Sequence, residues 1–384
     1  MVVKFQEILR SEVALGAVCG AYLVADLGNG GQERQLYNLV SQISEDKTML
    51  IIPWDYNEED RYVKLLGEAP NILVLNLEGK GFKAKVSRIR QVLKATNASY
   101  LHSYSNHLNF VAWFACLGLR KRAIGGVRNR LVLNRRLNGK LRFYLSLVFP
   151  YFRISNNYNC FLDLDWPTRV LSKIFSKTIF VHNGIDTERF KPSIDRTLFY
   201  SQPGPLRTIS VGRLYPVKQI DQIIDWVFEM KKKGFQVLHR HAGQGPEKDF
   251  LLKKIQELQL AEDFQFAGNV TNVPEFMNSA DFLIHAAKFE GCPNVIMEAM
   301  ACGLPILSSD AGDISVIVDQ GQSGFVYTID DRESRLEYGV QLASNADLMS
   351  QFSKNAVKKA RKEFGLNQYV VAIRKAYKQM GINI

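Results

Sequence analysis

Short apolar runs recur along the chain, and between them apolar residues return every three or four positions. The first pattern is typical of buried strands and the second of amphipathic helices. Strands that alternate with helices predict parallel sheets covered on both faces, an α/β fold. The predicted strands are Tyr22–Asp26, Met49–Pro53, Ile72–Leu75, Tyr100–His102, Ala123–Gly125, Tyr151–Ile154 and Thr178–Val181 in the first half, and Thr208–Gly212, Gln236–Ala242, Phe264–Ala267, Phe282–Ala286, Ile306–Ser309 and Phe325–Tyr327 in the second.

The chain length of 384 residues fits two such domains. The stretch FKPSIDRTLFYSQPGPLR holds three prolines and has little periodicity, which favours an interdomain linker over residues 191–206. We therefore expect a first Rossmann-like domain over 1–190 and a second over 207–365, both doubly wound, with a cleft between them. Ligands of such sheets bind beyond the carboxyl ends of the strands.

Composition indicates a soluble globular protein, with 46% hydrophobic and 23% charged residues. No apolar run reaches the roughly 18 residues of a membrane span. The longest one, Val13–Ala25, lacks the basic start and cleavage pattern of a signal peptide. The five cysteines are scattered and never spaced CxxC, which argues against a disulfide framework or a zinc site. A cytoplasmic location is expected.

Positive charge is concentrated in the first half. Of the net charge of +11, residues 1–186 carry +10, and no Asp or Glu occurs between Glu78 and Asp163. Within this window a predicted helix places Phe82, Val86, Ile89 and Leu93 on one face, with lysines and arginines around it. A solvated basic face is one interpretation. An anionic membrane surface or phosphorylated lipid is the favoured partner. No nucleic-acid-binding motif accompanies the charge, so no nucleic-acid partner is expected.

Two basic residues follow the strand Thr208–Gly212. Gly212 allows a tight turn, after which Arg213 and Lys218 come at the carboxyl edge of the sheet. A bidentate guanidinium and a mobile ammonium together form a phosphate clamp, unless they are a chance surface pair. Gly243 after the next strand permits close backbone approach. The backbone of Gly268, Asn269 and Val270 after the strand that follows could bind the edge of a base.

The stretch FEGCPNVIMEAMACGLP places Glu290 and Glu298 eight residues apart in a segment that otherwise resembles a protein core. Pro293 suits the first turn of a helix, whose free amides at Asn294 and Val295 would favour an anion. Glu298 would then lie between one and two turns into the helix, where a carboxylate can bind the hydroxyls of a ribose. Glu290, beside Gly291 and Cys292, would remain in the loop and bind a sugar. A purely structural capping role is the alternative.

These motifs resemble the retaining glycosyltransferases of family 4, which have the GT-B fold. The matching segments run in the family order over roughly Val181 to Val326: VHNGIDTERFKP, VGRLYPVKQID, AGQGPEKDF, FAGNV and FEGCPNVIMEAMACGLPILSSDAGDISVIV. The resemblance implies that Arg213 and Lys218 bind the nucleotide diphosphate, Glu298 the ribose and Glu290 the transferred sugar. It also implies a helix, Asn367–Met380 within residues 366–384, that crosses back to the first domain.

The first domain carries a weaker likeness. ADLGNGGQERQLYNLV resembles the first glycine loop of the family, which implies Gly31, beside Gly30, near the phosphates and acceptor. Many relatives have an H-x-H pair after the fourth strand. Here His102 matches the first histidine, Tyr104 stands at the second, and His107 follows a helical turn later. We expect these residues and Arg128 on the acceptor side. A satisfied structural role is the alternative for either histidine.

The resemblance implies transfer with retention, in which the leaving phosphate accepts the acceptor's proton while Arg213, Lys218 and helix amides stabilise its charge. No cofactor besides the nucleotide-sugar co-substrate and no metal is expected. Asp163 and Asp165 are spaced like a metal-binding motif of a different fold, and His239 and His241 share a strand face without an evident third ligand.

The expected activity is transfer of a sugar from a nucleotide-diphosphate sugar to a saccharide or lipid-linked acceptor, in envelope polysaccharide assembly at the inner membrane face. The assignment to envelope polysaccharide assembly is inferred by analogy with the family. A GT-B sugar-nucleotide epimerase would bind the same donor without a membrane acceptor. A non-catalytic scaffold would keep the fold and lose the chemistry, and the set Arg213, Lys218, Glu290 and Glu298 argues against it.

Overall fold

In the computed structural model the chain divides into two compact α/β units. Unit 1 comprises Met1–Gly184 and Leu366–Ile384, and unit 2 comprises Ile185–Gly365. The residues described are 1–8, 18–28, 30–44, 47–78, 81–128, 149–156, 170, 173–174 and 176–383. The Asp163-x-Asp165 spacing, residues 9–17 and much of the basic window, 129–148 included, lie outside these residues.

Unit 1 is built on a parallel sheet with the strand order β1-β4-β3-β2-β5-β6-β7-β8. Its strands are β1 (Val2–Lys4), β2 (Val18–Val24), β3 (Thr48–Pro53), β4 (Ile72–Asn76), β5 (Tyr100–Ser103), β6 (Arg122–Val127), β7 (Phe152–Ser155) and β8 (Lys177–Phe180). The predicted α/β class is confirmed. The edge strand β1, only three residues long, was not predicted.

Helices cover both faces of this sheet because its strands are apolar on both sides. One face packs on α3 (Gly31–Ile43), α4 (Arg61–Glu68) and α17 (Leu366–Gln379), through residues such as Leu36, Leu66 and Ile373. The other packs on α1 (Phe5–Ile8), α5 (Phe82–Ala95) and α6 (Asn109–Cys116). Helix α17 follows unit 2 in the sequence and still belongs to the core of unit 1.

Unit 2 repeats the arrangement with the strand order β11-β10-β9-β12-β13-β14. Its strands are β9 (Leu206–Val211), β10 (Val237–Ala242), β11 (Phe264–Gly268), β12 (Phe282–His285), β13 (Ile306–Ser309) and β14 (Gly324–Tyr327). All pair in parallel, so their carboxyl ends share one edge.

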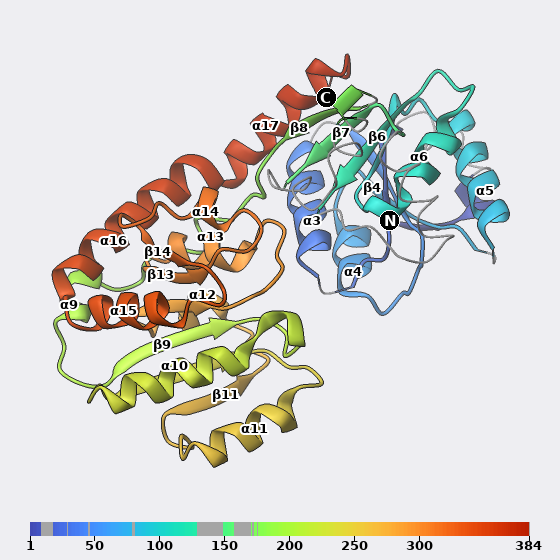
Figure 1. Ribbon diagram of the computed structural model, residues 1–384. Helices are drawn as coiled ribbons and strands as arrows, with labels where there is room; N and C mark the ends of the chain where they lie inside the picture. The colour runs from blue at the N-terminus through green and yellow to red at the C-terminus, as the bar shows by residue number, and fades with distance from the viewer. Residues whose placement is uncertain are drawn as a thin grey trace. The chain divides into compact units, whose positions relative to one another are not determined.

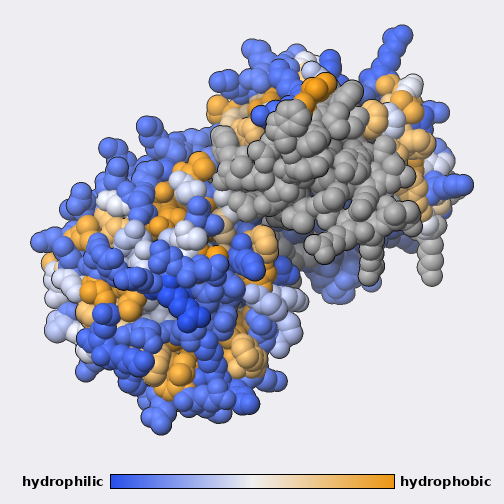
Figure 2. Space-filling view, viewed as in Figure 1, coloured by the Kyte–Doolittle hydropathy of each residue, from blue (hydrophilic) through white to orange (hydrophobic). Residues whose placement is uncertain are grey.

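The helices of unit 2 also lie on both faces. One face packs on α12 (Val273–Asn278), α13 (Asn294–Ala301) and α14 (Ile314–Ile317). The other packs on α10 (Ile220–Lys232), α11 (Lys248–Glu257) and α15 (Arg332–Ala343). Residues of α16 (Ala346–Lys359) contribute to both clusters, and a π-helical turn, Ala360–Phe364, follows it. On the side drawn in Figure 2, apolar residues of unit 2 lie in small patches among hydrophilic ones.

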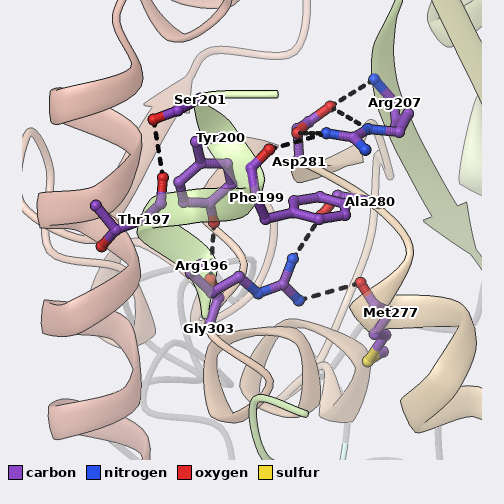
Figure 3. A network of polar contacts seen from close by, with 10 residues as sticks. All are labelled: Arg196, Thr197, Phe199, Tyr200, Ser201, Arg207, Met277, Ala280, Asp281 and Gly303. Atoms are coloured by element: carbon purple, nitrogen blue, oxygen red, sulfur yellow. Dashed lines mark hydrogen bonds and ion pairs between the residues drawn. The ribbon is translucent and has the colours of Figure 1, made fainter. Parts of the chain in front are cut away.

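Residues 191–206, predicted as a linker, lie inside unit 2 and contain the helix α9 (Arg196–Tyr200). The buried guanidinium of Arg196 donates to the carbonyls of Ala280 at 2.6 Å and Cys302 at 3.1 Å. The hydroxyl of Tyr200 donates to Gly303 O at 3.1 Å. Close by, Arg207 binds the carboxylate of Asp281 through two nitrogens, and Figure 3 shows these contacts apart from the one to Cys302. The segment is thus tied to the rest of unit 2.

No helix in the described part of the chain is both long enough and apolar enough to cross a membrane.

Candidate functional site

The loops at the carboxyl edge of the unit 2 sheet are joined to one another by backbone hydrogen bonds. The amide of Leu214 donates to Gln244 O at 2.9 Å, which ties the loop after β9 to the loop after β10. Gly243 N donates to Gly268 O at 2.8 Å, and Lys288 N donates to Val217 O at 2.9 Å. The loops after β9, β10, β11 and β12 therefore form one continuous floor.

Glycine is required where two of these loops touch. A Cβ added to Gly243, whose φ is +148°, would lie 1.8 Å from Gly212 O. A Cβ at Gly245 would lie 2.3 Å from Leu214 O. The close approach predicted for Gly243 is thus made to the loop after β9.

Lys218, Glu290 and His285 meet at this edge. The ammonium of Lys218 binds Oε1 of Glu290, and Nε2 of His285 lies 3.1 Å from the same oxygen. His285 is the last residue of β12, Lys218 ends the short 3-10 helix Pro216–Lys218, and Glu290 lies in the loop after β12. Burial raises the pKa of Glu290, but the hydrogen bond and charge of His285, and then Lys218, outweigh it and lower that pKa to about 2. Glu290 is a fixed carboxylate between two nitrogen donors.

Arg213 is exposed at the same edge, with its guanidinium 5.1 Å from the centre of the Tyr215 ring. Neither its side chain nor its amide donates a hydrogen bond to any described residue. The two members of the predicted clamp therefore differ: Lys218 is paired with Glu290, and Arg213 faces solvent.

The helix predicted after Glu290 is α13. It begins at Asn294 with Pro293 as its N-cap, and the amide of Ile296 donates back to Pro293 O at 3.2 Å. Glu298 lies about one turn into this helix and is 4% exposed. Val295 packs against the apolar cluster below.

Two further predicted positions in this region are apolar or constrained. Cys292 is buried in the same cluster as Val295, which suits a packing residue. The carbonyl of Gly291 accepts the amide of Asp313 at 3.1 Å, so the loop of Glu290 is anchored to the start of α14.

The predicted base-binding segment follows β11. Gly268 has a φ of +67°, in the left-handed region that favours glycine. The side-chain amide of Asn269 donates to Gln244 Oε1 at 3.3 Å, and Val270 packs against the core. These residues join the same floor through Gln244.

The predicted acceptor residues all lie in unit 1. His102 is fully buried, and its Nδ1 lies 2.6 Å from the hydroxyl of Tyr377 on α17. Burial and then the charge of Arg128 lower its pKa. Tyr104 is also fully buried, with its hydroxyl 2.9 Å from that of Tyr369. Both side chains hold α17, which favours the structural alternative for His102.

Other unit 1 positions differ in exposure. The guanidinium of Arg128 is buried and stacks 4.0 Å from the centre of the Tyr104 ring, whereas His107 is exposed.

Gly30 is the N-cap of α3, and the helix begins at Gly31. A Cβ at Gly30 would lie 2.1 Å from Glu33 Oε2, the movable end of a side chain, and the φ of Gly30 is −81°, so this position does not require glycine.

Sequence reasoning missed His285. A polar residue that closes an otherwise apolar strand, FLIH, at the edge where ligands bind was the available signal. Within the described residues, no group of three or more His, Cys, Asp or Glu side chains is arranged to hold a metal ion.

Comparison with known proteins finds a family match for the unit that carries this edge. Residues 200–359 match the family model described as glycosyl transferases group 1. The lipopolysaccharide core biosynthesis mannosyltransferase LpsB of Rhizobium meliloti is 25% identical over 214 residues, covering 53% of this chain and 61% of LpsB. The putative colanic acid biosynthesis glycosyltransferase WcaL of Escherichia coli is 29% identical over 198 residues, covering 49% of this chain and 47% of WcaL. The chain thus spans about half the length of these relatives.

Solved structures share the fold of the chain. Anabaena HepE in complex with UDP has a TM-score of 0.79 at 19% identity, over 94% of this chain and all of that one. The lipopolysaccharide outer core galactosyltransferase WaaB has a TM-score of 0.71 at 15% identity, over 94% of this chain and 99% of that one. At such identities the likeness shows the fold alone, and the fold is the predicted GT-B fold.

Proposed function

We propose that this protein is a retaining glycosyltransferase of family 4 that moves a sugar from a nucleotide-diphosphate sugar to a saccharide or lipid-linked acceptor. The observation that carries the proposal is the cluster of Lys218, Glu290 and His285 at the carboxyl edge of unit 2, beside exposed Arg213 and the start of α13. The family match over residues 200–359 supports it, since it covers all five of these features.

The donor's diphosphate would meet Arg213 and Lys218. Because Lys218 is paired with Glu290, a phosphate that binds the ammonium brings the sugar attached to it within reach of the carboxylate. The low pKa of Glu290 suits a hydrogen-bond acceptor for sugar hydroxyls, and it argues against a general acid at neutral pH. Glu298 would accept the hydroxyls of the ribose.

Transfer would proceed with retention at the anomeric carbon. The bond from that carbon to the diphosphate oxygen breaks, and the acceptor oxygen bonds on the same face. The leaving phosphate takes the acceptor's proton. Arg213 and Lys218 would stabilise the charge that develops on the diphosphate. Because side chains supply this positive charge, the scheme assigns no step to a metal.

The acceptor is proposed from charge and from relatives. Residues 1–186 hold +10 of the net charge, which suits an anionic membrane surface or an anionic acceptor. LpsB, WcaL and the amylovoran biosynthesis glycosyltransferase AmsD of Erwinia amylovora are named for envelope polysaccharides. We assign the chain to such a pathway, acting from the cytoplasmic side at the inner face of the cell membrane.

A screen of sugar nucleotides tests the proposal. We expect one nucleotide-diphosphate sugar to stabilise the protein against heat. When an envelope saccharide acceptor is added, the nucleoside diphosphate of that donor should be released. Retention is read from the anomeric configuration of the product. Interconversion of the free sugar nucleotide without transfer would support the epimerase alternative, and binding without turnover would support a scaffold.

A further inference from the structure

Two histidines on β10 and two hydroxyls on β9 form a buried chain of hydrogen bonds that leads to the candidate site. Thr208 Oγ1 lies 2.9 Å from His239 Nδ1, and His239 Nε2 lies 2.8 Å from Ser210 Oγ. Ser210 Oγ lies 2.7 Å from His241 Nδ1, and His241 Nε2 lies 3.0 Å from the carbonyl oxygen of Gly212. All four side chains belong to residues at most 2% exposed. We call this chain the histidine relay.

The carbonyl at the end of the relay determines the direction of every bond in it. A carbonyl oxygen can only accept a hydrogen bond, so His241 Nε2 carries the ring proton and donates a hydrogen bond to Gly212 O. Neutral His241 must then accept at Nδ1 from the Ser210 hydroxyl. Ser210 in turn accepts from His239 Nε2, and His239 accepts from Thr208.

Neutral rings follow from the surroundings of the relay. Burial lowers the pKa of His239, and His241 lowers it further. For His241, burial outweighs the bond to Gly212 O, and the pKa falls to about 4. The rings of Phe264 and Phe266 on β11 flank the pair, and the electrostatic interaction with His285 on β12 lowers the pKa of His241 further. All four ring nitrogens are occupied, so the pair is not available to a metal.

The last bond of the relay orients a peptide of the candidate site. In a trans peptide the carbonyl and the following amide point in opposite directions. His241 holds the Gly212 carbonyl toward the protein interior, so the amide of Arg213 points away from it. That amide donates to no residue in the described part of the chain.

We propose that His241, backed by Ser210 and His239, is a positioning residue that holds the Gly212–Arg213 peptide with its amide toward a phosphate of the donor. Arg213 would then bind the diphosphate with its backbone and its guanidinium together. The inference rests on the proposed function and deepens it. It assigns a role in donor binding to side chains that lie under the floor of the site and do not touch the ligand.

Binding of UDP, GDP and ADP, each compared with its nucleoside, tests the role of His241. His241→Phe keeps a ring and removes both nitrogens, whereas His241→Gln keeps an N–H that can reach the Gly212 carbonyl. We expect His241→Phe to weaken the best-binding diphosphate about tenfold, the scale of one lost hydrogen bond, and to leave nucleoside binding unchanged. His241→Gln should recover most of the loss. Melting curves establish that each variant is folded.

Three outcomes overturn the inference. Equal loss for nucleoside and diphosphate would mean general damage to the floor, and unchanged diphosphate binding in a folded His241→Phe would mean that the peptide needs no such support. Both leave the proposed function intact, because the parent protein still binds nucleotide. A parent that binds none of the three diphosphates contradicts the proposed function as well.

Histidine NMR of the parent protein tests the relay without any ligand. Long-range nitrogen–proton correlations should show both rings neutral, with the proton on Nε2, from pH 8 to pH 6. A proton on Nδ1 of His241, or a charged ring at pH 6, would contradict the direction of the hydrogen bonds in the relay. Thr208→Val, at the far end of the relay, should change the His239 signals more than those of His241.

Discussion

Nε2 of His285 lies 3.1 Å from Oε1 of Glu290, the oxygen that also binds the ammonium of Lys218. The carboxylate at the centre of the candidate site is therefore held from two sides by side chains of two different segments. The position of Glu290 depends on its charge, because a protonated carboxyl would accept the hydrogen bonds of Lys218 and His285 less well than the carboxylate does. This arrangement leads to separate predictions for stability and for catalysis.

The stability of the fold should depend on the ionisation of Glu290 in acid. Its pKa falls from 4.5 to about 2 on folding. The ionised form therefore stabilises the fold above pH 4.5, and this contribution is lost as the pH falls toward 2. The shift corresponds to at most about 3 kcal/mol. Melting scans of the parent and Glu290→Gln should differ most above pH 5 and converge by pH 2. A gap that stays constant with pH would contradict the shift.

The two glutamates of the site should affect different kinetic constants. Glu298 is proposed to bind the ribose, which does not react, so Glu298→Gln should mainly raise the donor KM. Glu290 is proposed to bind the transferred sugar, so Glu290→Gln should mainly lower kcat. Initial rates at varied donor concentration separate the two. If Glu290→Gln turns over at the parent's rate and only binds donor more weakly, Glu290 is not at the reacting centre.

Arg213 should contribute to diphosphate binding more than its exposure suggests. Arg213→Ala is expected to weaken binding of the nucleoside diphosphate by roughly 1.5–3 kcal/mol, the range for hydrogen bonds to charged groups. Isothermal titration measures this loss. Lys253→Ala on α11 removes one positive charge from a side chain that is 77% exposed and serves as the matched control. Equal losses in both variants would indicate a general effect of charge.

Membrane binding should depend on the exposed lysines of α5 rather than on its arginines. Arg90 donates to the carbonyls of Phe114, Ala115 and Leu117, and Arg88 donates to Leu77 O, so both serve the fold. Lys83 and Lys94 are exposed. Each basic residue near an anionic surface contributes about 1 kcal/mol. Lys83→Glu with Lys94→Glu should therefore reduce sedimentation with anionic vesicles and leave diphosphate affinity unchanged.

Salt provides the control for the membrane prediction. Binding to vesicles that contain anionic lipid should be lost at high salt, since exposed charges are screened. Vesicles of neutral lipid should not bind the protein at any salt concentration. Failure of the parent protein to bind anionic vesicles at low salt would remove the membrane surface from the proposed function.

The segment 191–206 gives a prediction about stability. Arg196→Met should destabilise unit 2 by about 1–3 kcal/mol, because the carbonyls of Ala280 and Cys302 would lose their buried donor. Lys191→Met, at a side chain that is 51% exposed, should have little effect. Thermal or urea melts measure both. A neutral Arg196→Met would mean that the segment behaves as a linker after all.

The sequence predicted every strand of both sheets except β1 within a few residues, because parallel strands buried on both faces form continuous apolar runs. It predicted the start of α13 from Pro293, since that signal is local. It did not predict that residues 191–206 fold onto unit 2. Their proline content indicates a linker, whereas the contacts of Arg196 join residues far apart in the sequence.

The sequence could not predict which side chains of the site contact one another. The spacing of Lys218 and Glu290 in the sequence does not show that they meet, since they lie after different strands. His239 and His241 could be placed on one strand face. Their role depends on Ser210 of the neighbouring strand and on the register that aligns His241 with it.

The place of α17 in unit 1 has a consequence for how the chain folds as it is made. Every residue of unit 2 leaves the ribosome before Tyr369 and Tyr377, whose hydroxyls pair with Tyr104 and His102. Domains that fold during synthesis usually do so in sequence order. Here unit 2 can complete its core first, while one face of the unit 1 sheet waits for its third helix. The unit that is begun first is the last to be finished, and a nascent chain stalled before residue 366 would expose the apolar surface that α17 covers.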